Sequence, residues 1–132
     1  MQGVILAAGQ GTRMGNLEIP KCLLKIDDIT LIEYQLMCLK KLGIDDILIV
    51  TGYNDQMIKQ HLGSKVKYAF NKNFENTNNL HSLSKAKDFV TNDFICLHAD
   101  LLFHPDILRK CVEHKSMICL AVERNTRDDS MR

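Results

Sequence analysis

The stretch VILAAGQGTRMG, residues 4–15, followed five residues later by Pro20 and Lys21, decides how this chain can fold. Its apolar start predicts a short buried strand over Gln2–Ala8 that leads directly into a loop. The glycines of this loop let backbone N–H groups approach phosphate oxygens without a side chain in the way. Arg13 can grip a phosphate through its planar fork, and Lys21 adds a compact point charge. The stretch therefore predicts an anion-binding site at the end of the first strand.

Two better-known glycine-rich loops fit these residues poorly. A dinucleotide-binding loop needs a third glycine and an unbroken helix, but Met14 stands at the glycine position and Pro20 would break the helix. The acidic residue expected after the second strand is also missing, since that strand ends in Thr51-Gly52-Tyr53. A P-loop needs Gly-Lys-Ser/Thr after four spacers, and no such tripeptide follows Gly9. A plain tight turn is the remaining alternative, in which the glycines only permit positive φ.

Strand-like and helix-like segments alternate along the rest of the chain. Helices are predicted to begin at Thr30, Asn54, Asn79 and His104, and strands are predicted at residues 47–50, 66–70, 94–97 and 117–122. The first helix carries a capping box of Thr30 and Glu33 and should end at Gly43. The helix from Asn79 should face inward through Leu83, Ala86 and Val90. This alternation predicts a three-layer α/β/α sandwich with a Rossmann-like, mostly parallel sheet, in one domain spanning residues 1–132.

The composition excludes several classes of function. A net charge of +1 gives no global field that would favour nucleic acid or an anionic membrane, and no apolar run is long enough to span a bilayer. The five cysteines form no CxxC pair, so we expect reduced, mostly buried thiols and no zinc site. No signal-peptide pattern precedes the first strand, which favours a cytoplasmic protein.

Three segments far apart in the sequence should meet at one edge of the sheet. In open α/β sheets, ligands bind beyond the carboxyl ends of the strands, and the first loop, Gly52-Tyr53 and Asp100 all follow strands. Asp100 has two interpretations: a simple turn cap, or a ligand for Mg²⁺, which prefers carboxylates together with phosphate oxygens and water. Gly52-Tyr53 is interpreted equally as a strand-to-helix turn or as a contact to a nucleobase.

An asparagine-rich segment at residues 76–83 is the second specific signal. Amide side chains carry both donors and acceptors, so Asn78 and Asn79 can read the edge of a nucleobase. Ser82 can contribute a hydroxyl to the base or ribose. The alternative is a plain polar loop with a helix cap.

Residues 4–26, 76–83 and 94–100 together resemble the sugar-phosphate nucleotidyltransferases of the NTP-transferase fold family. The segment Asn78-Asn79-Leu80-His81-Ser82-Leu83 resembles the NNxxSL element of the choline-phosphate cytidylyltransferase branch. The resemblance implies transfer of a nucleoside monophosphate, CMP from CTP, to a phosphorylated or phosphonylated small molecule, with release of pyrophosphate and with Mg²⁺ as cofactor. A sugar-1-phosphate nucleotidyltransferase using another NTP, or a truncated nucleotide-binding module without activity, are the alternatives.

The resemblance also implies roles for individual residues. Arg13 and the loop amides would hold the β and γ phosphates, Lys21 would neutralise charge near the α-phosphate and the acceptor, and Asp100 would hold the metal. Arg13, Lys21 and Asp100 are thus the expected catalytic residues. The expected nucleotide-binding residues are Leu6, Ala7, Ala8, Gly9, Gly11, Thr12, Arg13, Lys21, Gly52, Tyr53, Asn78, Asn79 and Ser82.

The departure from the family lies at the C-terminus. Family members continue well beyond residue 132, and their later segments supply the acceptor pocket and a second metal-binding Asp. We therefore expect a fold that is incomplete at its C-terminus, either a fragment or a chain completed by a partner. The expected partners are an NTP, with CTP favoured, and a small phosphorylated acceptor, with no nucleic acid and no membrane. An exposed sheet edge makes a homo-oligomer an open alternative.

Overall fold

The computed structural model describes residues 1–9, 19–73 and 79–119 of the chain. The strands in this part are β1 (Gln2–Ala7), β2 (Lys25–Ile26), β3 (Ile29–Thr30), β4 (Ile47–Thr51), β5 (Lys67–Phe70) and β6 (Phe94–His98). The α-helices are α1 (Leu31–Lys41), α2 (Asp55–Leu62), α3 (Asn79–Ser84) and α4 (Pro105–Glu113). Two 3₁₀ turns, η2 (Lys21–Leu23) and η3 (Gly63–Lys65), complete the set.

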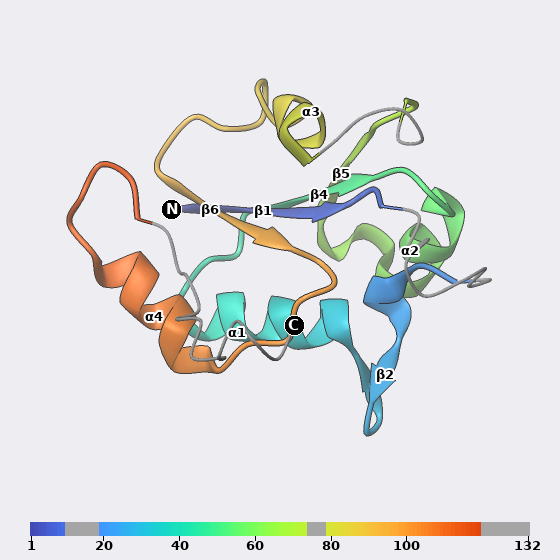
Figure 1. Cartoon of the computed structure of the whole chain (residues 1–132), viewed down its shortest axis with the longest axis horizontal. Helices are drawn as coiled ribbons and strands as arrows, with labels where there is room; N and C mark the ends of the chain where they lie inside the picture. The colour runs from blue at the N-terminus through green and yellow to red at the C-terminus, as the bar shows by residue number, and fades with distance from the viewer. Residues whose placement is uncertain (10–18, 74–78, 120–132) are drawn as a thin grey trace, which may run out of the picture.

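Four strands form one parallel sheet in the order β5-β4-β1-β6. β1 lies in the middle, with Ile5 opposite Ile49 of β4 on one side and opposite Leu97 of β6 on the other. Because every strand runs the same way, all four carboxyl ends lie at one edge, toward the right in Figure 1. The predicted α/β fold with a mostly parallel sheet is confirmed for the described residues.

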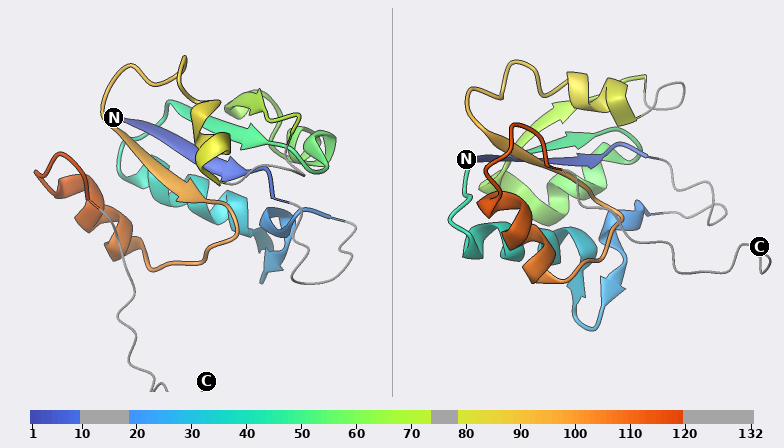
Figure 2. Two further views of the ribbon diagram at one scale, coloured as in Figure 1. Left: turned by 45° about the horizontal axis from the view of Figure 1, so that its top comes forward. Right: turned by 60° about the vertical axis from the view of Figure 1, so that its left-hand side comes forward.

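Helices cover both faces of the sheet, as the alternation along β1 requires. Ile5 and Ala7 point toward α1, α2 and α4, where they pack with Ile32, Leu36, Leu39, Ile58, Leu62 and Leu108. Val4 and Leu6 point to the opposite face, toward the α3 side, where Ala86 is buried against them. The two views in Figure 2 show the sheet between these layers, with α3 on one side and α1 and α4 on the other. The face under α1 carries the larger core.

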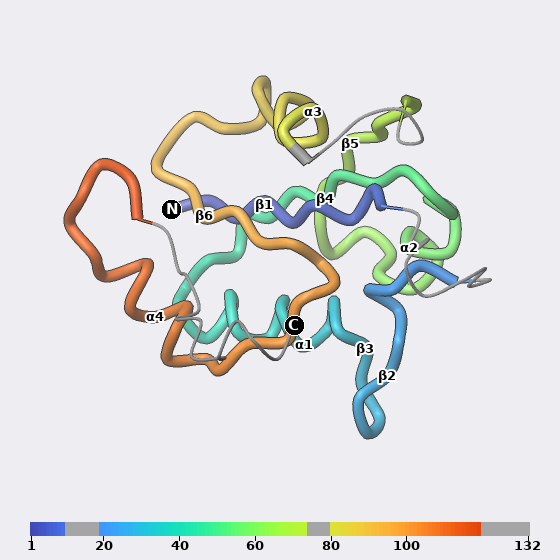
Figure 3. The backbone as a smooth tube through the Cα atoms, in the orientation of Figure 1, coloured from blue at the N-terminus to red at the C-terminus, as the bar shows by residue number. Residues whose placement is uncertain are grey.

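The helix α1 begins and ends where the sequence predicts. Thr30 accepts a hydrogen bond from the backbone N–H of Glu33, whose side chain reaches back to the N–H of Thr30. This capping box supplies partners for two donors that the helix leaves unpaired. At the other end Gly43 adopts φ +80°, a conformation that glycine reaches without strain. Just before α1, the β2–β3 hairpin extends away from the sheet, as the tube in Figure 3 shows.

The predictions for residues 79–90 and 117–122 were wrong in part. Asn79 is the first described residue of α3, and the helix ends at Ser84, before Ala86 and Val90. The chain then continues in tight turns, which still bring Ala86 and Val90 onto the sheet. Residues 117–119 form no strand: Met117 is 100% exposed and packs against nothing. The rest of that predicted strand, residues 120–122, lies outside the described residues.

The cysteines follow their prediction only partly. All five are free, and Cys22 and Cys38 are buried, but Cys119 is exposed. Within the described part of the chain, no helix is long and apolar enough to cross a membrane.

Candidate functional site

Backbone hydrogen bonds join the segments that leave the carboxyl edge of the sheet. The carbonyl of Leu6 accepts a bond of 3.0 Å from the N–H of Ala99, which holds the exit of β6 against the end of β1. The carbonyl of Ala8 accepts a bond of 3.3 Å from the N–H of Tyr53, which does the same for the exit of β4. The three segments predicted to converge are therefore neighbours.

A small open pocket lies at this edge, between the end of β1, the turn η2 and the exit of β6. Its lining residues are Ala7, Gly9, Pro20, Lys21, Cys22, His98, Ala99 and Asp100. A Cβ atom built on Gly9 would meet no atom within 4 Å, so the backbone there borders open space. The pocket thus presents backbone and two opposite charges to whatever enters it.

Lys21 and Asp100 form what we call the charged corner of the pocket. The turn η2 places Lys21, because Pro20 precedes it and the carbonyl of Pro20 accepts a hydrogen bond from the N–H of Leu23. The Lys21 Nζ atom lies 3.9 Å from Asp100 Oδ2, and the two side chains are 23% and 48% exposed. Such a long and solvated ion pair contributes little to stability. Both charges remain available to a ligand.

Cys22 lies next to this corner but is not a nucleophile. Burial raises the pKa of its thiol to about 12, and the negative charge of Asp100 acts in the same direction. The thiolate is the reactive form of cysteine, so a thiol with this pKa stays protonated and inert near neutral pH. Cys22 therefore serves to pack the floor of the pocket.

Asn71 and Ser82 form what we call the amide corner, at the exit of β5. Asn71 is fully buried, and its N–H donates to the carbonyl of Thr51 at the end of β4. Its side-chain Nδ2 donates to Ser82 Oγ over 3.2 Å, and its Oδ1 accepts from the N–H of Asn73 over 3.1 Å. Ser82 is only 5% exposed. These hydrogen bonds join α3, through Ser82, to the exits of β4 and β5.

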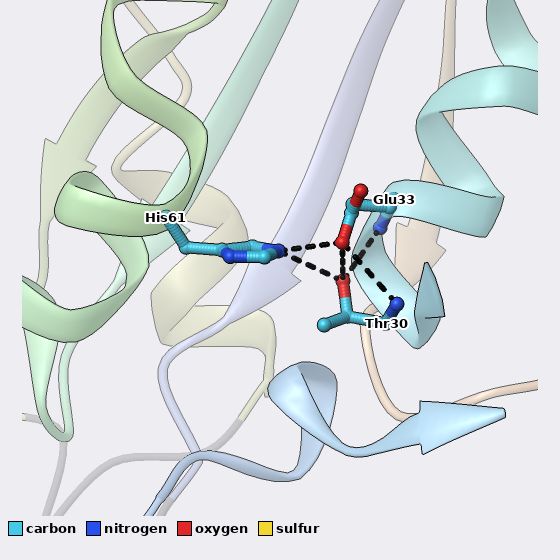
Figure 4. Close-up of polar contacts among 3 residues, drawn as sticks. All are labelled: Thr30, Glu33 and His61. Carbon is cyan, nitrogen blue, oxygen red and sulfur yellow. Dashed lines mark hydrogen bonds and ion pairs between the residues drawn. The ribbon is translucent and has the colours of Figure 1, made fainter. Parts of the chain in front are cut away.

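Figure 4 shows a third polar cluster, between α1 and α2, whose residues do not line the pocket. His61 Nε2 lies 2.7 Å from Glu33 Oε1 and 3.2 Å from Thr30 Oγ1. Partial burial alone would raise the pKa of Glu33, but hydrogen bonds from Thr30 and His61 outweigh it and lower that pKa. The cluster ties the end of α2 to the capping box of α1.

The structure places most of the predicted site residues along the carboxyl edge. Leu6, Ala7, Ala8 and Gly52 are buried there, Tyr53 is half-buried, and Gly9 is exposed. Gly11, Thr12, Arg13 and Asn78 lie outside the described residues, and so does the side chain of Asn79.

Two buried amides, Gln35 and Asn71, were not among the predicted site residues. Gln35 stands on the apolar stripe of α1, and a polar residue on a buried stripe is the signal that would have found it. Asn71 directly follows β5, as the other edge residues follow their strands.

The donor set for a metal ion is small. In residues 1–9, 19–73 and 79–119, no group of three or more His, Cys, Asp or Glu side chains could hold a metal. Asp100 supplies the carboxylate among the described pocket residues. One or two carboxylates are what Mg²⁺ uses when substrate phosphates provide its other ligands. Asp100 fits a metal of that kind, bound together with a nucleotide.

A parallel α/β sheet with a charged pocket at its carboxyl edge is typical of nucleotide-binding proteins. Comparison with known protein families identifies which one: residues 3–129 match the MobA-like NTP transferase domain. The chain belongs to this nucleotidyltransferase family, and the resemblance described from the sequence is confirmed.

Curated relatives in the family use different nucleotides. The chain is 30% identical to CTP:phosphoglutamine cytidylyltransferase of Campylobacter jejuni over 95% of its own length and 53% of the relative. It is 33% identical to D-glycero-alpha-D-manno-heptose 1-phosphate guanylyltransferase of the same organism, over 94% of the chain and 58% of the relative. Among solved structures, the CTP:phosphocholine cytidylyltransferase of Streptococcus pneumoniae matches with 34% identity and a TM-score of 0.68, over 80% of this chain and 49% of that one. The chain spans about half the length of these relatives.

Proposed function

We propose that the protein transfers CMP from CTP to a small phosphorylated or phosphonylated acceptor and releases pyrophosphate. The observation that carries the proposal is the charged corner. Lys21 and Asp100 line one pocket at the carboxyl edge, and the 3.9 Å between them leaves both charges available to a ligand. A triphosphate with its metal ion supplies both missing partners, because phosphate oxygens match a lysine and a divalent cation matches a carboxylate.

In the proposed reaction, an oxygen of the acceptor's phosphate or phosphonate attacks the α-phosphorus of the nucleotide. The bond from that phosphorus to the bridging oxygen of the β-phosphate breaks, and pyrophosphate leaves with the electron pair. Positioning and neutralisation of charge supply most of the rate in such reactions. Lys21 would neutralise charge at the α-phosphate and the acceptor, and Arg13 with the loop around Gly9 and Gly11 would hold the leaving phosphates.

We propose that Asp100 holds Mg²⁺ against the triphosphate. The metal, when bound, would neutralise phosphate charge. Asp100 is suited to this role because it is half exposed at the mouth of the pocket, and because Lys21 at 3.9 Å is too far away to occupy its oxygens fully. The nucleoside would extend toward Gly52, Tyr53 and the segment of Asn78 and Asn79. Ser82, which accepts a hydrogen bond from Asn71, would hold that segment in place.

The names of the relatives favour CTP, since two of the three cited above are cytidylyltransferases. A guanylyltransferase in the same set favours a second candidate, transfer of another nucleotide to a sugar 1-phosphate. In either case we propose that residues 1–132 form one domain, the nucleotide-binding part of the enzyme, in the cytoplasm.

The experiment that tests the proposal measures pyrophosphate release by the protein with each of the four NTPs and Mg²⁺. The acceptors to test are phosphocholine, an aminoalkylphosphonate, inositol phosphate and a sugar 1-phosphate. Release with CTP and one acceptor supports the proposal and names the substrate. Release only with another NTP and a sugar 1-phosphate supports the second candidate. If no pair gives release while CTP still raises the melting temperature, the chain by itself is a nucleotide-binding module.

A further inference from the structure

Gln35 is a fully buried amide on the inner face of α1, where its neighbours on the helix are Ile32, Leu36 and Leu39. An amide in apolar surroundings costs free energy unless it is hydrogen-bonded, so its position requires partners. A leucine or methionine would pack the same stripe without that requirement. The polar group at this position therefore does something that packing alone does not explain.

The partners of Gln35 lie on both sides of Asp100. Its Nε2 donates one hydrogen bond to the carbonyl of His98 and a second to the carbonyl of Leu101, each of 2.8 Å. Both amide hydrogens are thus used on the segment that carries the carboxylate. Gln35 Oε1 accepts no hydrogen bond within the described part of the chain. Gln35 therefore holds a single turn of the chain through two hydrogen bonds, one on each side of Asp100.

The backbone of this turn is fixed from other sides as well. The N–H of Leu101 donates to the carbonyl of His98, and the N–H of Ala99 donates to Leu6 of β1. Together with the two hydrogen bonds from Gln35, these bonds hold the residues before and after Asp100 to both β1 and α1. The Asp100 side chain itself lines the pocket and is half exposed there.

We propose that Gln35 is a positioning residue that holds the turn of Asp100 so that its carboxylate is placed for a divalent cation at the nucleotide site. This inference rests on the proposed metal role of Asp100. Residues that orient a metal ligand through hydrogen bonds typically change metal affinity by about 10- to 100-fold when they are replaced. Gln35 acts through the backbone of the turn and touches no ligand itself.

The neighbouring residue offers a matched control. Tyr34 also lies on α1 and also bonds the connection after β6, since its hydroxyl donates to the carbonyl of Phe103 over 2.9 Å. That carbonyl lies beyond the turn, so Tyr34→Phe removes a hydrogen bond of the same kind without loosening Asp100. A general weakening of α1 packing would affect both variants alike.

The test titrates the whole protein with Mn²⁺ at a fixed concentration of CTP and follows bound metal by the relaxation of water protons. Gln35→Met keeps an unbranched side chain of similar length and removes the donor. We expect it to raise the Mn²⁺ concentration at half saturation at least about 10-fold. Tyr34→Phe should change that concentration less than about twofold, and CTP binding without metal should be unaffected in both variants.

Asp100→Asn separates the possible failures. If Asp100→Asn leaves the Mn²⁺ midpoint unchanged, the proposed metal role of Asp100 fails, and the role of Gln35 fails with it. If Asp100→Asn weakens binding but Gln35→Met behaves like Tyr34→Phe, only the positioning role is overturned. Should Gln35→Met fail to fold, Gln35→Leu removes the same donor with a side chain that suits the apolar stripe of α1. The same weakening is then expected, and an unchanged midpoint overturns the proposal.

Discussion

The charged corner and the amide corner lie along the same edge of the sheet, yet their polar groups are satisfied to very different degrees. Lys21 and Asp100 face each other over 3.9 Å, and Asp100 is half exposed. Asn71 and Ser82 are buried and bonded to each other and to the backbone. The first corner leaves its interactions for a ligand, whereas the second uses them within the fold.

This difference indicates how replacements in the two corners should behave. Replacing a side chain that makes few interactions within the folded protein should change ligand binding or reaction rate and leave stability nearly intact. Removing a buried group leaves its protein partners unpaired and therefore changes stability first. Replacements in and near the two corners test this separation.

The largest effect is expected from Lys21→Ala. Under the proposed mechanism, turnover should fall by about 100-fold or more, because a positioned charge on the reacting phosphates is lost. The melting temperature should change little, since the ion pair with Asp100 is long and solvated. Lys25→Ala, an exposed lysine on the neighbouring hairpin, is the matched control and should keep its activity. Steady-state kinetics and thermal unfolding measure both; full turnover in Lys21→Ala would remove this residue from the mechanism.

Asn71→Ala should show the reverse pattern. The variant leaves Ser82 Oγ and the N–H of Asn73 without their partner, which we expect to lower the free energy of unfolding by about 2 kcal/mol. Denaturant unfolding measures this loss, with Lys72→Ala on the exposed neighbour as the control. A variant as stable as the parent protein, but with impaired CTP binding, would show that the amide corner is a ligand site after all.

Thr30→Ala tests whether the charged corner depends on the start of α1. The hydroxyl of Thr30 caps the helix, so its loss should cost about 1 kcal/mol in the free energy of unfolding. Turnover at a temperature well below unfolding should change less than about twofold, because η2 holds Lys21 by its own hydrogen bonds. A large loss of turnover without unfolding would mean that the two regions are coupled.

The smallest effect is expected from His61→Ala, and it concerns pH. The pKa of Glu33 is lowered from its ordinary 4.5, so the folded state binds fewer protons than the unfolded state below that pH. The stability that this carboxylate contributes is present above pH 4.5 and is lost as the pH falls through its folded pKa. His61→Ala should raise the pKa of Glu33 toward 4.5 and so make the loss of stability at low pH smaller. Carboxyl ¹³C shifts followed by NMR measure that pKa, and an unchanged value would show that His61 has no influence.

The order of the elements could be read from particular residues. Thr30, Glu33 and Gly43 carry local hydrogen-bonding and backbone requirements that fix both ends of α1. The apolar runs at residues 2–8 and 47–50 predicted strands, and β1 and β4 are buried throughout. The end of α3 was not predictable in this way, because the spacing of Leu83, Ala86 and Val90 indicates which residues pack on the sheet and not the backbone conformation that brings them there. At residues 117 and 118 the apolar pattern did not even indicate burial, since Met117 and Ile118 are exposed.

The sequence by itself determined the first strand, the alternation of elements, and the chemical types of Lys21 and Asp100. Each of these depends on local propensity, on periodicity or on the functional groups of single residues. Only the tertiary structure decided which polar groups meet. Gln35 donates hydrogen bonds to the residues on both sides of Asp100, which are 63 and 66 positions away in the sequence. Asn71 is hydrogen-bonded to Ser82, whereas the side chain of Asp100 stays half exposed. Distances between groups so far apart in sequence follow from the packing of α1 and α3 on the sheet, which no local pattern encodes.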